Sequence, residues 1–329
     1  MTALAPVLQT FFTDRLARQQ EASPRTVTAY RDTFRLLLAF ASGQAGAPPS
    51  RLSVEDLSAP LILAFLDHLE RDRGNTARTR NARLAAIRSL FTHAALRHPE
   101  HAAQIQQVLA IPLKRFDKAL VAFLTEPEAA ALISAPDTAR WEGRRDRAML
   151  ALAIQAGLRV SELAGLSTGD IRLAGGPHVR CHGKGRKERT TPLTSEITAV
   201  MKTWVSERAG QPAEPLFPTR TGRRLSPDAV QDLVARHTAS AAASCPSLDS
   251  KHVTPHVLRH TAAMRLLHAG VDTSVIALWL GHEDVRSTQP YLHADLTIKE
   301  RAIARTAPAG TEPGRYQPPD ELLAFLEAL

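Results

Sequence analysis

The chain has 329 residues, a length that favours two domains over one. Its 41 lysines and arginines against 33 aspartates and glutamates give a net charge of +8, which is typical of proteins that bind a polyanion such as nucleic acid, but also occurs in proteins that are merely basic. The two cysteines exclude a disulfide framework and a Cys-x-x-Cys metal site, and they fit a reducing cytoplasm. The start of the chain lacks the pattern of a signal peptide, and no uninterrupted apolar run reaches the roughly 18 residues that span a bilayer, so no membrane partner is expected.

The first third of the sequence has the apolar spacing of helices. The first helix carries Leu8, Phe11, Phe12 and Leu16 on one face. Ser23 followed by Pro24 predicts the start of a second helix, and a third is expected after Ser58. A fourth covers residues 76–98, with its buried stripe formed by Leu84, Ile87, Phe91 and Ala94.

That fourth helix is a candidate DNA-binding element. Arginines at the margins of the apolar stripe flank a face of small residues, which we expect to consist of Ala82, Ala85, Ala86 and Ser89. Such a face could lie close to a DNA backbone while the arginines reach phosphates or guanine edges. The alternative, which this helix alone favours, is a solvated helix with snorkelling arginines. The candidates are Arg80, Arg83 and Arg88.

Residues 113–123 read as a basic linker in which Lys114 and Arg115 are further candidates for DNA contacts. Thr125 with Glu128 is the pattern of a capping box, so a second unit is predicted to begin near residue 124.

The second unit is predicted to be mainly helical with a small β-sheet. A strongly apolar helix ends at Gly157, and the segments "DIRL", "HVRC" and "RTTPL" alternate like short strands, of which the last two form a hairpin around "HGKGRK". Helices are expected over 194–208 and 226–243, after Thr254, after a cap at Thr273, and over 295–305. A proline- and glycine-rich tether then leads to a short apolar helix from residue 320, which is too short to be stable unless it docks.

Five polar segments of the second unit carry the candidate chemistry. They are "GLRVSEL" with Arg159, "GKGRKER" with Lys184, "HVLRH" with His256 and Arg259, "LGH" with His282, and "QPYLH" with Tyr291. No Walker loop or Gly-x-Ser-x-Gly elbow is present. His256 and His260 have the spacing of zinc ligands, but no glutamate follows His256 and Arg259 would place a cation on the same face, so no metal is expected.

A set of cations and one phenol suits a phosphodiester. Two guanidiniums can hold the non-bridging oxygens, imidazoles can donate further hydrogen bonds, a lysine can protonate the leaving oxygen, and a phenolate can attack phosphorus. Each residue also has a purely structural interpretation. Arg159 could pair with Glu162, and His282 could cap a helix. The charges of Lys184, Arg186 and Lys187 could simply keep a turn in solvent, and His256 and Arg259 could form a polar helix face.

In this order, the set resembles the active site of the tyrosine recombinase (phage integrase) family, closest in layout to Xer-like recombinases. The resemblance covers about residues 5–305. It implies two domains that form a C-clamp around DNA: a helical core-binding domain at 1–112, the linker at 113–123, an α+β catalytic domain at 124–305, and a tether with an exchange helix at 306–329. Arg186 and Lys187, on the hairpin turn, are expected to contact DNA.

The resemblance also implies the reaction and the partners. Tyr291 would attack a backbone phosphate to form a 3′-phosphotyrosine, in integration, excision or dimer resolution, without a cofactor or metal. The enzyme would act in the cytoplasm as a tetramer on two duplex DNA sites, passing its C-terminal helix to a neighbouring copy or a related recombinase. Pro290 departs from the usual apolar residue before the nucleophile and leaves cis or trans delivery open. The alternatives are a non-catalytic DNA-binding protein on the same scaffold and a type IB topoisomerase.

Overall fold

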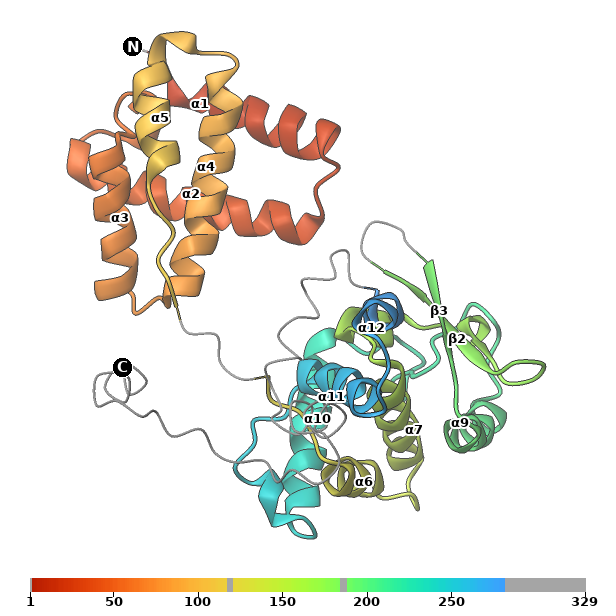
Figure 1. Cartoon of the computed structure of the whole chain (residues 1–329). Helices are drawn as coiled ribbons and strands as arrows, with labels where there is room; N and C mark the ends of the chain where they lie inside the picture. Colours follow the sequence, from red (N-terminus) through yellow and green to blue (C-terminus); the bar gives the residue numbers. More distant parts are fainter. Residues whose placement is uncertain (1, 117–120, 184–187, 282–329) are drawn as a thin grey trace, which may run out of the picture. The chain divides into compact units, whose positions relative to one another are not determined.

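The computed structural model describes residues 2–116, 121–183 and 188–281, and divides the chain into two compact units, Met1–Lys118 and Ala119–Leu329 (Figure 1). The helix expected over 295–305, the tether and the C-terminal helix lie outside the described residues. Among the helices that are described, none is both long and apolar enough to cross a membrane.

The first unit is helical, as predicted. Its elements are α1 (Leu4–Thr10), a π-helical segment (Phe11–Gln19), α2 (Pro24–Ala45), α3 (Ala59–Arg71), α4 (Ala77–Ala95) and α5 (Ala102–Ala110), with single 3₁₀ turns at Pro49–Arg51 and Pro99–His101. The predicted starts are confirmed, because the hydroxyls of Ser23, Ser58 and Thr76 accept backbone N–H groups at 3.2, 3.4 and 3.3 Å. Helix α5 was not predicted; within it Ile105 and Val108 are buried.

The core of the first unit is aromatic. The Phe11 ring is fully buried and packs against Phe12, Tyr30, Phe34 and His93, with ring centroids 5.6 to 6.2 Å apart. The stripe predicted for α4 is buried as expected. Ala86, which the sequence placed on the opposite face, is a correction, because it is buried as well, and the exposed small face is narrower than expected.

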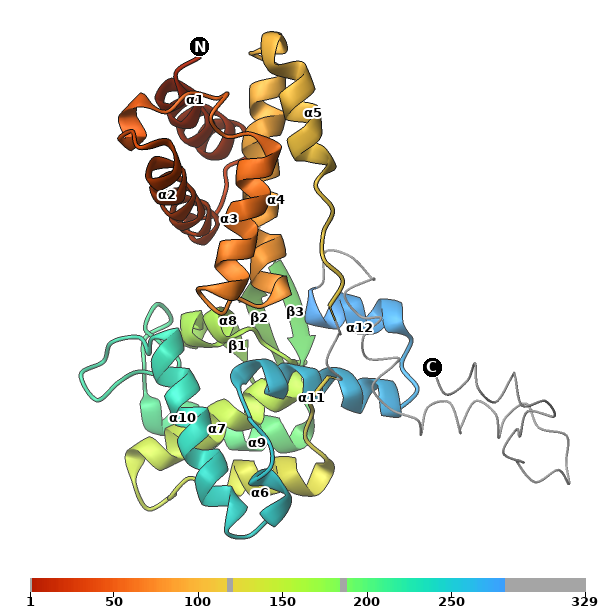
Figure 2. The same ribbon diagram turned by 90° about the vertical axis from the view of Figure 1, so that its left-hand side faces the viewer.

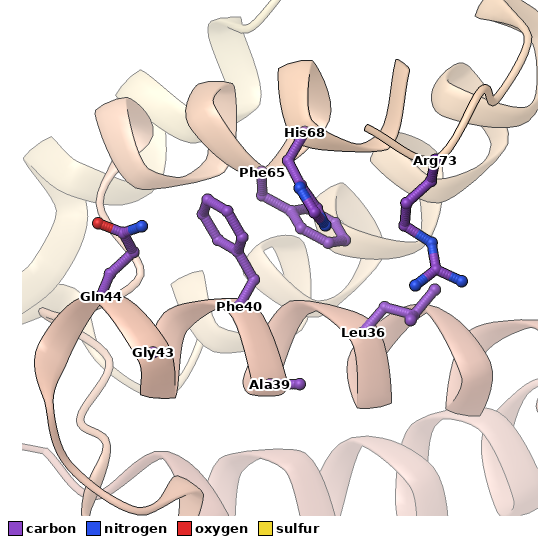
Figure 3. A pocket seen from close by; sticks show the side chains of 8 residues that line it. All are labelled: Leu36, Ala39, Phe40, Gly43, Gln44, Phe65, His68 and Arg73. Carbon is purple, nitrogen blue, oxygen red and sulfur yellow. The ribbon is translucent and has the colours of Figure 1, made fainter. Parts of the chain in front are cut away.

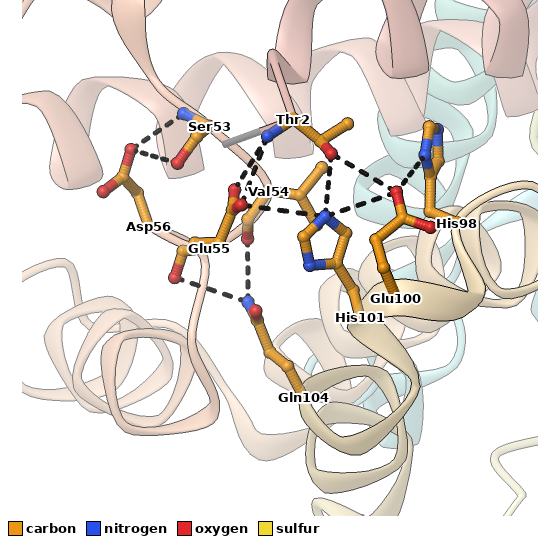
Figure 4. A network of polar contacts seen from close by, with 9 residues as sticks. All are labelled: Thr2, Ser53, Val54, Glu55, Asp56, His98, Glu100, His101 and Gln104. Carbon is orange, nitrogen blue, oxygen red and sulfur yellow. Dashed lines mark hydrogen bonds and ion pairs between the residues drawn. The ribbon is translucent and has the colours of Figure 1, made fainter.

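A polar network fastens the beginning of the chain (Figure 4). The backbone N–H of Thr2 donates to both carboxylate oxygens of Glu55 at 3.2 Å, and the Thr2 hydroxyl lies 2.8 Å from Nε2 of His101. Gln104 on α5 donates to the carbonyl of Val54 at 2.7 Å. The network therefore joins residue 2 to the loop before α3 and to the start of α5.

The second unit is mainly helical with one small sheet, as predicted. Its helices are α6 (Glu126–Ser134), α7 (Trp141–Ala156), α8 (Val160–Gly165), α9 (Ser195–Arg208), α10 (Pro227–Ala242), α11 (Pro255–His268) and α12 (Thr273–Leu280), with 3₁₀ turns at Thr168–Asp170 and Pro246–Leu248. The strands β1 (Ile171–Arg172), β2 (His178–His182) and β3 (Glu188–Pro192) are antiparallel in that order, so the predicted hairpin is confirmed.

Sequence signals at the ends of helices are mostly confirmed in this unit. Glu128 accepts the Thr125 N–H at 2.8 Å in the predicted capping box, and α7 ends at Gly157 with φ at 64°. One cap is a correction: Asp272 rather than Thr273 caps α12, because its carboxylate accepts the Ser274 N–H at 2.8 Å. Helix α7 is buried on most of its surface and packs with α6, α9 and α11 (Figure 2), which makes it the centre of the unit.

Candidate active site

Three of the six predicted catalytic residues lie in the described part of the chain: Arg159, His256 and Arg259. The other three, Lys184, His282 and Tyr291, lie outside the described residues, as do Arg186 and Lys187. Arg159 is the residue directly before α8. His256 and Arg259 lie three residues apart on α11 and are therefore neighbours on its surface.

The guanidinium of Arg259 joins the ends of two helices. Its Nη1 donates to the carbonyl of Gly157 and its Nη2 donates to the carbonyl of Leu280, both at 2.7 Å. These carbonyls end α7 and α12, where the last turn has no partner within its own helix and where a cation is electrostatically favoured. Since Arg259 is only 3% exposed, it holds α7, α11 and α12 in a fixed arrangement.

The guanidinium of Arg159 reaches the same place from another element. Its Nη2 donates to the carbonyl of Gly281 at 2.9 Å, and its Nη1 donates to Glu162 at 2.8 Å. The pairing with Glu162, which the sequence offered as the structural alternative, is therefore present. It does not separate the two arginines, because both end on consecutive carbonyls at the end of α12, directly before His282 in the sequence.

Glu162 is the acidic centre of this cluster. It is buried, and it accepts hydrogen bonds from the backbone N–H and Nη1 of Arg159 at 2.8 Å and from Nη1 and Nη2 of Arg189 at 2.9 and 2.7 Å. Burial raises its pKa, but the bonds from Arg189 and Arg159 outweigh burial and lower the pKa to about 2. The carboxylate is therefore ionised at any ordinary pH.

Arg189, on β3, was not among the residues that the sequence predicted for the site. Its only sequence signal is its place in the basic segment "GKGRKER", and no spacing links it to Glu162, which precedes it by 27 residues. A pair formed between a strand and a helix so far apart in the sequence depends on the tertiary fold, which a local pattern does not report.

Two glycines allow these backbones to approach each other. Gly157 and Gly281 both have φ at 64°, a left-handed conformation that favours glycine. A Cβ on Gly157 would lie 2.5 Å from Cδ2 of Leu280 and 3.1 Å from Cβ of Ala262. A Cβ on Gly281 would lie 3.1 Å from Cδ and from Nη1 of Arg189. The glycines of the "GLR" and "LGH" segments are therefore needed for close packing.

His256 lies on the first turn of α11 and is exposed, with its ring centroid 4.1 Å from that of His260. Within the described ranges, no group of three histidine, cysteine, aspartate or glutamate side chains is placed to hold a metal ion. Cys181 is buried, and burial raises the pKa of its thiol to about 12, which keeps it protonated and unreactive.

Comparison with known proteins shows the family to which this chain belongs. Residues 122–297, more than half of the chain, match the model of the phage integrase family, and residues 10–98 match the phage integrase N-terminal SAM-like domain. The chain belongs to the phage integrase family. It is therefore a site-specific tyrosine recombinase, as the sequence predicted, with the expected fold of a helical N-terminal domain and a mainly helical catalytic domain with a small sheet.

Relatives of this recombinase cover nearly its whole length. The Sinorhizobium fredii protein y4rC, whose name describes an integrase/recombinase, is 53% identical over 99% of this chain and 98% of its own. The tyrosine recombinase XerD of Pseudomonas putida is 31% identical over 94% of this chain and 100% of its own.

Solved structures of recombinases share the fold at lower identity. The XerH site-specific recombinase bound to palindromic difH substrate matches 88% of this chain and 82% of its own, with a TM-score of 0.66 at 20% identity. The Tn1549 transposon integrase in complex with a circular intermediate DNA matches 91% of this chain and 99% of its own, with a TM-score of 0.69 at 17% identity.

The basic residues predicted to contact DNA in the first unit of the recombinase separate into two groups. Arg80 is 3% exposed, donates to the carbonyl of Pro112 at 3.3 Å, and lies 3.7 Å from the carboxylate of Glu70. Arg88 donates to the carbonyl of Ile111, and Lys114 pairs with Glu70 at 2.6 Å. These three side chains fasten residues 111–114 onto α3 and α4, which favours the structural interpretation over phosphate contact.

Arg83 and Arg115 form the second group. Arg83 is partly buried, and burial is the main cause that lowers its pKa. Arg115 is exposed at the end of the segment that Arg80, Arg88 and Lys114 hold in place. Of the described candidates in this unit, Arg115 is therefore the one whose charge is most available to a polyanion.

One cleft of the first unit lies away from the predicted site of this recombinase. A cleft of about 340 Å³ between α2 and α3 (Figure 3) is lined mainly by apolar groups, with the Phe40 ring stacked 5.2 Å from that of His68. None of the predicted site residues lines it. A tyrosine recombinase acts on an extended duplex, so a charged surface is a better indication of its site than an apolar cleft.

Proposed function

We propose that this tyrosine recombinase cuts and rejoins duplex DNA through a 3′-phosphotyrosine formed at Tyr291. The observation that carries the proposal is the convergence of the Arg159 and Arg259 guanidiniums on the carbonyls of Leu280 and Gly281. Because His282 follows directly and Tyr291 nine residues later, the chain needs only a short segment to bring its phenol to the two cations.

In the proposed site, the arginines hold the phosphate. A guanidinium has five N–H donors, and the side chain of Arg159 uses two in its contacts with Glu162 and Gly281 while remaining 35% exposed. Its fork is therefore able to bind a non-bridging phosphate oxygen. Arg259 is more deeply buried than Arg159, so it contributes its positive charge to the site from the interior of the unit. His256 lies three residues, about one turn, before Arg259 on α11.

The reaction balances without any other reagent. The Tyr291 phenol loses its proton to solvent and its oxygen attacks phosphorus. The bond from phosphorus to the 5′ oxygen breaks, and Lys184 supplies the proton that turns the departing oxygen into a 5′-hydroxyl. The surrounding cations and the His256 and His282 imidazoles stabilise charge on the non-bridging oxygens and favour ionisation of the phenol, whose intrinsic pKa is about 10. A 5′-hydroxyl of the partner strand then attacks the phosphotyrosine and releases Tyr291.

Duplex DNA is the proposed partner, and the same chemistry serves integration, excision and dimer resolution. The net charge of +8 supports it, as do the solved relatives described as bound to DNA. We assign DNA contacts to Arg83, Arg115, Arg186 and Lys187, and fastening of the segment after α5 to Arg80, Arg88 and Lys114. A cytoplasmic location belongs to the same proposal, because both cysteines are free.

The proposed assembly is a tetramer on two sites, formed by copies of this chain or with a related recombinase. In it, residues 1–112 bind the core of the site, 113–123 link the domains, 124–305 carry the chemistry, and 306–329 pass the last helix to a neighbour. The apolar face of that helix, formed by Leu322, Leu323, Leu326 and Leu329, supports docking rather than independent folding.

A trapping experiment with DNA of randomised sequence tests the reaction. A pool of nicked duplexes with a randomised centre is incubated with the protein, and covalent complexes are isolated on a denaturing gel and sequenced. We expect the wild-type chain to form adducts, and Tyr291→Phe to form none while still binding duplex DNA. Tyr316→Phe, at another tyrosine that lies outside the predicted motifs, is the control and should form adducts. An adduct formed by Tyr291→Phe would overturn the assignment.

A further inference from the structure

We propose that Arg189 is a positioning residue that couples the β2–β3 hairpin to the phosphate-binding guanidinium of Arg159 through the carboxylate of Glu162. This inference rests on the proposed function, in which Arg159 holds the phosphate. It adds a residue to that machinery which would act without touching the DNA.

The contact between Arg189 and Glu162 is bidentate. Nη1 of Arg189 donates to one carboxylate oxygen of Glu162 at 2.9 Å and Nη2 donates to the other at 2.7 Å, with the arginine side chain 11% exposed. The first of these oxygens also accepts from Nη1 of Arg159. Two parallel charge-assisted bonds fix the orientation of a carboxylate as well as its position. The plane of Glu162, and with it the direction of the Arg159 fork, is thus set from β3.

The other face of Arg189 lies against the end of α12. A Cβ on Gly281 would come within 3.1 Å of both Cδ and Nη1 of Arg189. The guanidinium is therefore enclosed between Glu162 and Gly281, whose carbonyl accepts from Arg159. A movement of β3 at this point would disturb the Arg159 fork and the backbone that leads directly into His282.

The position of Arg189 in the hairpin gives this contact its functional meaning. Strands β2 and β3 pair with Cys181 opposite Arg189 and His182 opposite Glu188. The turn between them carries Lys184, the proposed general acid, five residues before Arg189. One side chain therefore links three segments that carry proposed catalytic residues: the hairpin, the start of α8, and the end of α12.

The charges around Glu162 predict how loss of Arg189 would show itself. Arg159 and Arg189 both lower the pKa of Glu162 against its burial. Burial lowers the pKa of Arg189, but the hydrogen bonds and the charge of Glu162 outweigh burial and raise it. The other carboxylate near this cluster is Asp170, which acts on the Cys181 thiol. Without Arg189, burial gains weight and the pKa of Glu162 rises. As the pH falls through the raised pKa, Glu162 becomes protonated and no longer holds Arg159.

The experiment measures single-turnover cleavage of a nicked duplex recovered by adduct trapping, from pH 5 to pH 9, in the full-length chain. For Arg189→Met we expect cleavage about 10- to 100-fold slower than wild type at pH 5, with partial recovery as the pH rises and little change in duplex binding. Arg189→Lys keeps the charge but not the fork, so we expect a smaller, pH-independent loss. Arg180→Met is the control and should cleave as wild type does. It removes a half-exposed arginine of the neighbouring strand β2, which lies 3.8 Å from the carboxylate of Asp170.

The outcomes separate this inference from the proposed function. A wild-type chain that forms no adduct overturns the reaction itself. If wild type cleaves and Arg189→Met cleaves equally well, or is slower by one constant factor at every pH, Arg189 has no positioning role. Thermal melting of each variant shows whether the unit is folded. If the methionine variant does not fold, the lysine variant decides the question, and cleavage by Arg189→Lys at the wild-type rate at every pH would overturn the positioning role.

Discussion

Arginines bind backbone carbonyls in both units of this recombinase, but with different consequences. In the first unit, Arg80 and Arg88 lie on one helix and hold residues 111 and 112 of the adjoining segment. In the second unit, Arg159 and Arg259 come from separate elements and meet at the end of α12. The first arrangement fastens a chain segment, whereas the second concentrates positive charge at one point and leaves Arg159 partly exposed.

The contrast shows what arginine spacing along a sequence can and cannot indicate. Three arginines on one helix have the spacing of a DNA-binding face, yet the structure uses two of them internally. Arg159 and Arg259 are a hundred residues apart in the sequence, so no local spacing links them, yet their guanidiniums converge. Convergence of distant segments is therefore better evidence for a site than local clustering of charge.

Breaking the convergence at Gly157 should have the largest effect on stability. In Gly157→Ala, the left-handed backbone and the new Cβ, 2.5 Å from Leu280, should lower the free energy of unfolding by about 3 kcal/mol. Gly270→Ala is the control, because Gly270 has φ at 81° but open space around it, and about 1 kcal/mol is expected there. Urea unfolding measures both, and equal losses would show that Leu280 does not crowd this position.

A comparison of Arg80 with Arg115 sharpens the contrast within the first unit. Arg80→Met should lower the free energy of unfolding by about 2 kcal/mol, because it removes a buried cation from Pro112 and Glu70. It should leave the salt dependence of binding to non-specific duplex DNA unchanged. Arg115→Ala should leave stability unchanged and reduce the slope of log affinity against log salt by about 0.9. A reduced slope in Arg80→Met would return Arg80 to the DNA surface.

The sequence predicted most elements of the fold because their signals are local. The hydroxyl caps at Ser23, Ser58 and Thr76 and the glycine at the end of α7 lie within a few residues of the groups they satisfy. Helix α5 was not predicted because it is short and only three of its nine residues are large and apolar. The cap of α12 was misplaced by one residue because Asp272 and Thr273 are both good caps.

The site was only partly readable for the same reason. The motif order indicated Arg159 and Arg259, and the structure brings both to the end of α12. The pair of Glu162 with Arg189 and the fastening role of Arg80 depend on contacts between residues far apart in the sequence or on burial, neither of which local periodicity reports.

Buried and exposed glutamates should differ in how much they contribute to stability at low pH, and this is the smallest of the effects expected here. Glu55 and Glu100 belong to the network at the start of the chain (Figure 4), whereas Glu128 is buried and pairs with Lys251 at 2.6 Å. Burial raises the pKa of Glu128, but Lys251, Ser247 and the Thr125 N–H lower it to about 2. Because the folded pKa is below the unfolded value, the stability it contributes is present above about pH 4.5 and is lost as the pH falls toward 2.

Glu128→Gln should therefore reduce the acid-induced loss of stability between pH 5 and pH 2 by about 1 kcal/mol. Glu196→Gln, at an exposed glutamate in the first turn of α9, is the matched control and should change the acid limb little. Urea midpoints measured across this pH range decide the matter, and identical acid limbs for wild type and Glu128→Gln would contradict the account.

The central claim is that the cations at the end of α12 serve a phenol at position 291. The most direct measurement is protease digestion of the trapped covalent complex, followed by mass spectrometry of the peptide that carries the nucleotide. We predict a nucleotide on Tyr291 through a phosphotyrosine bond. A nucleotide on Tyr30, on Tyr316 or on any residue other than tyrosine would contradict the claim.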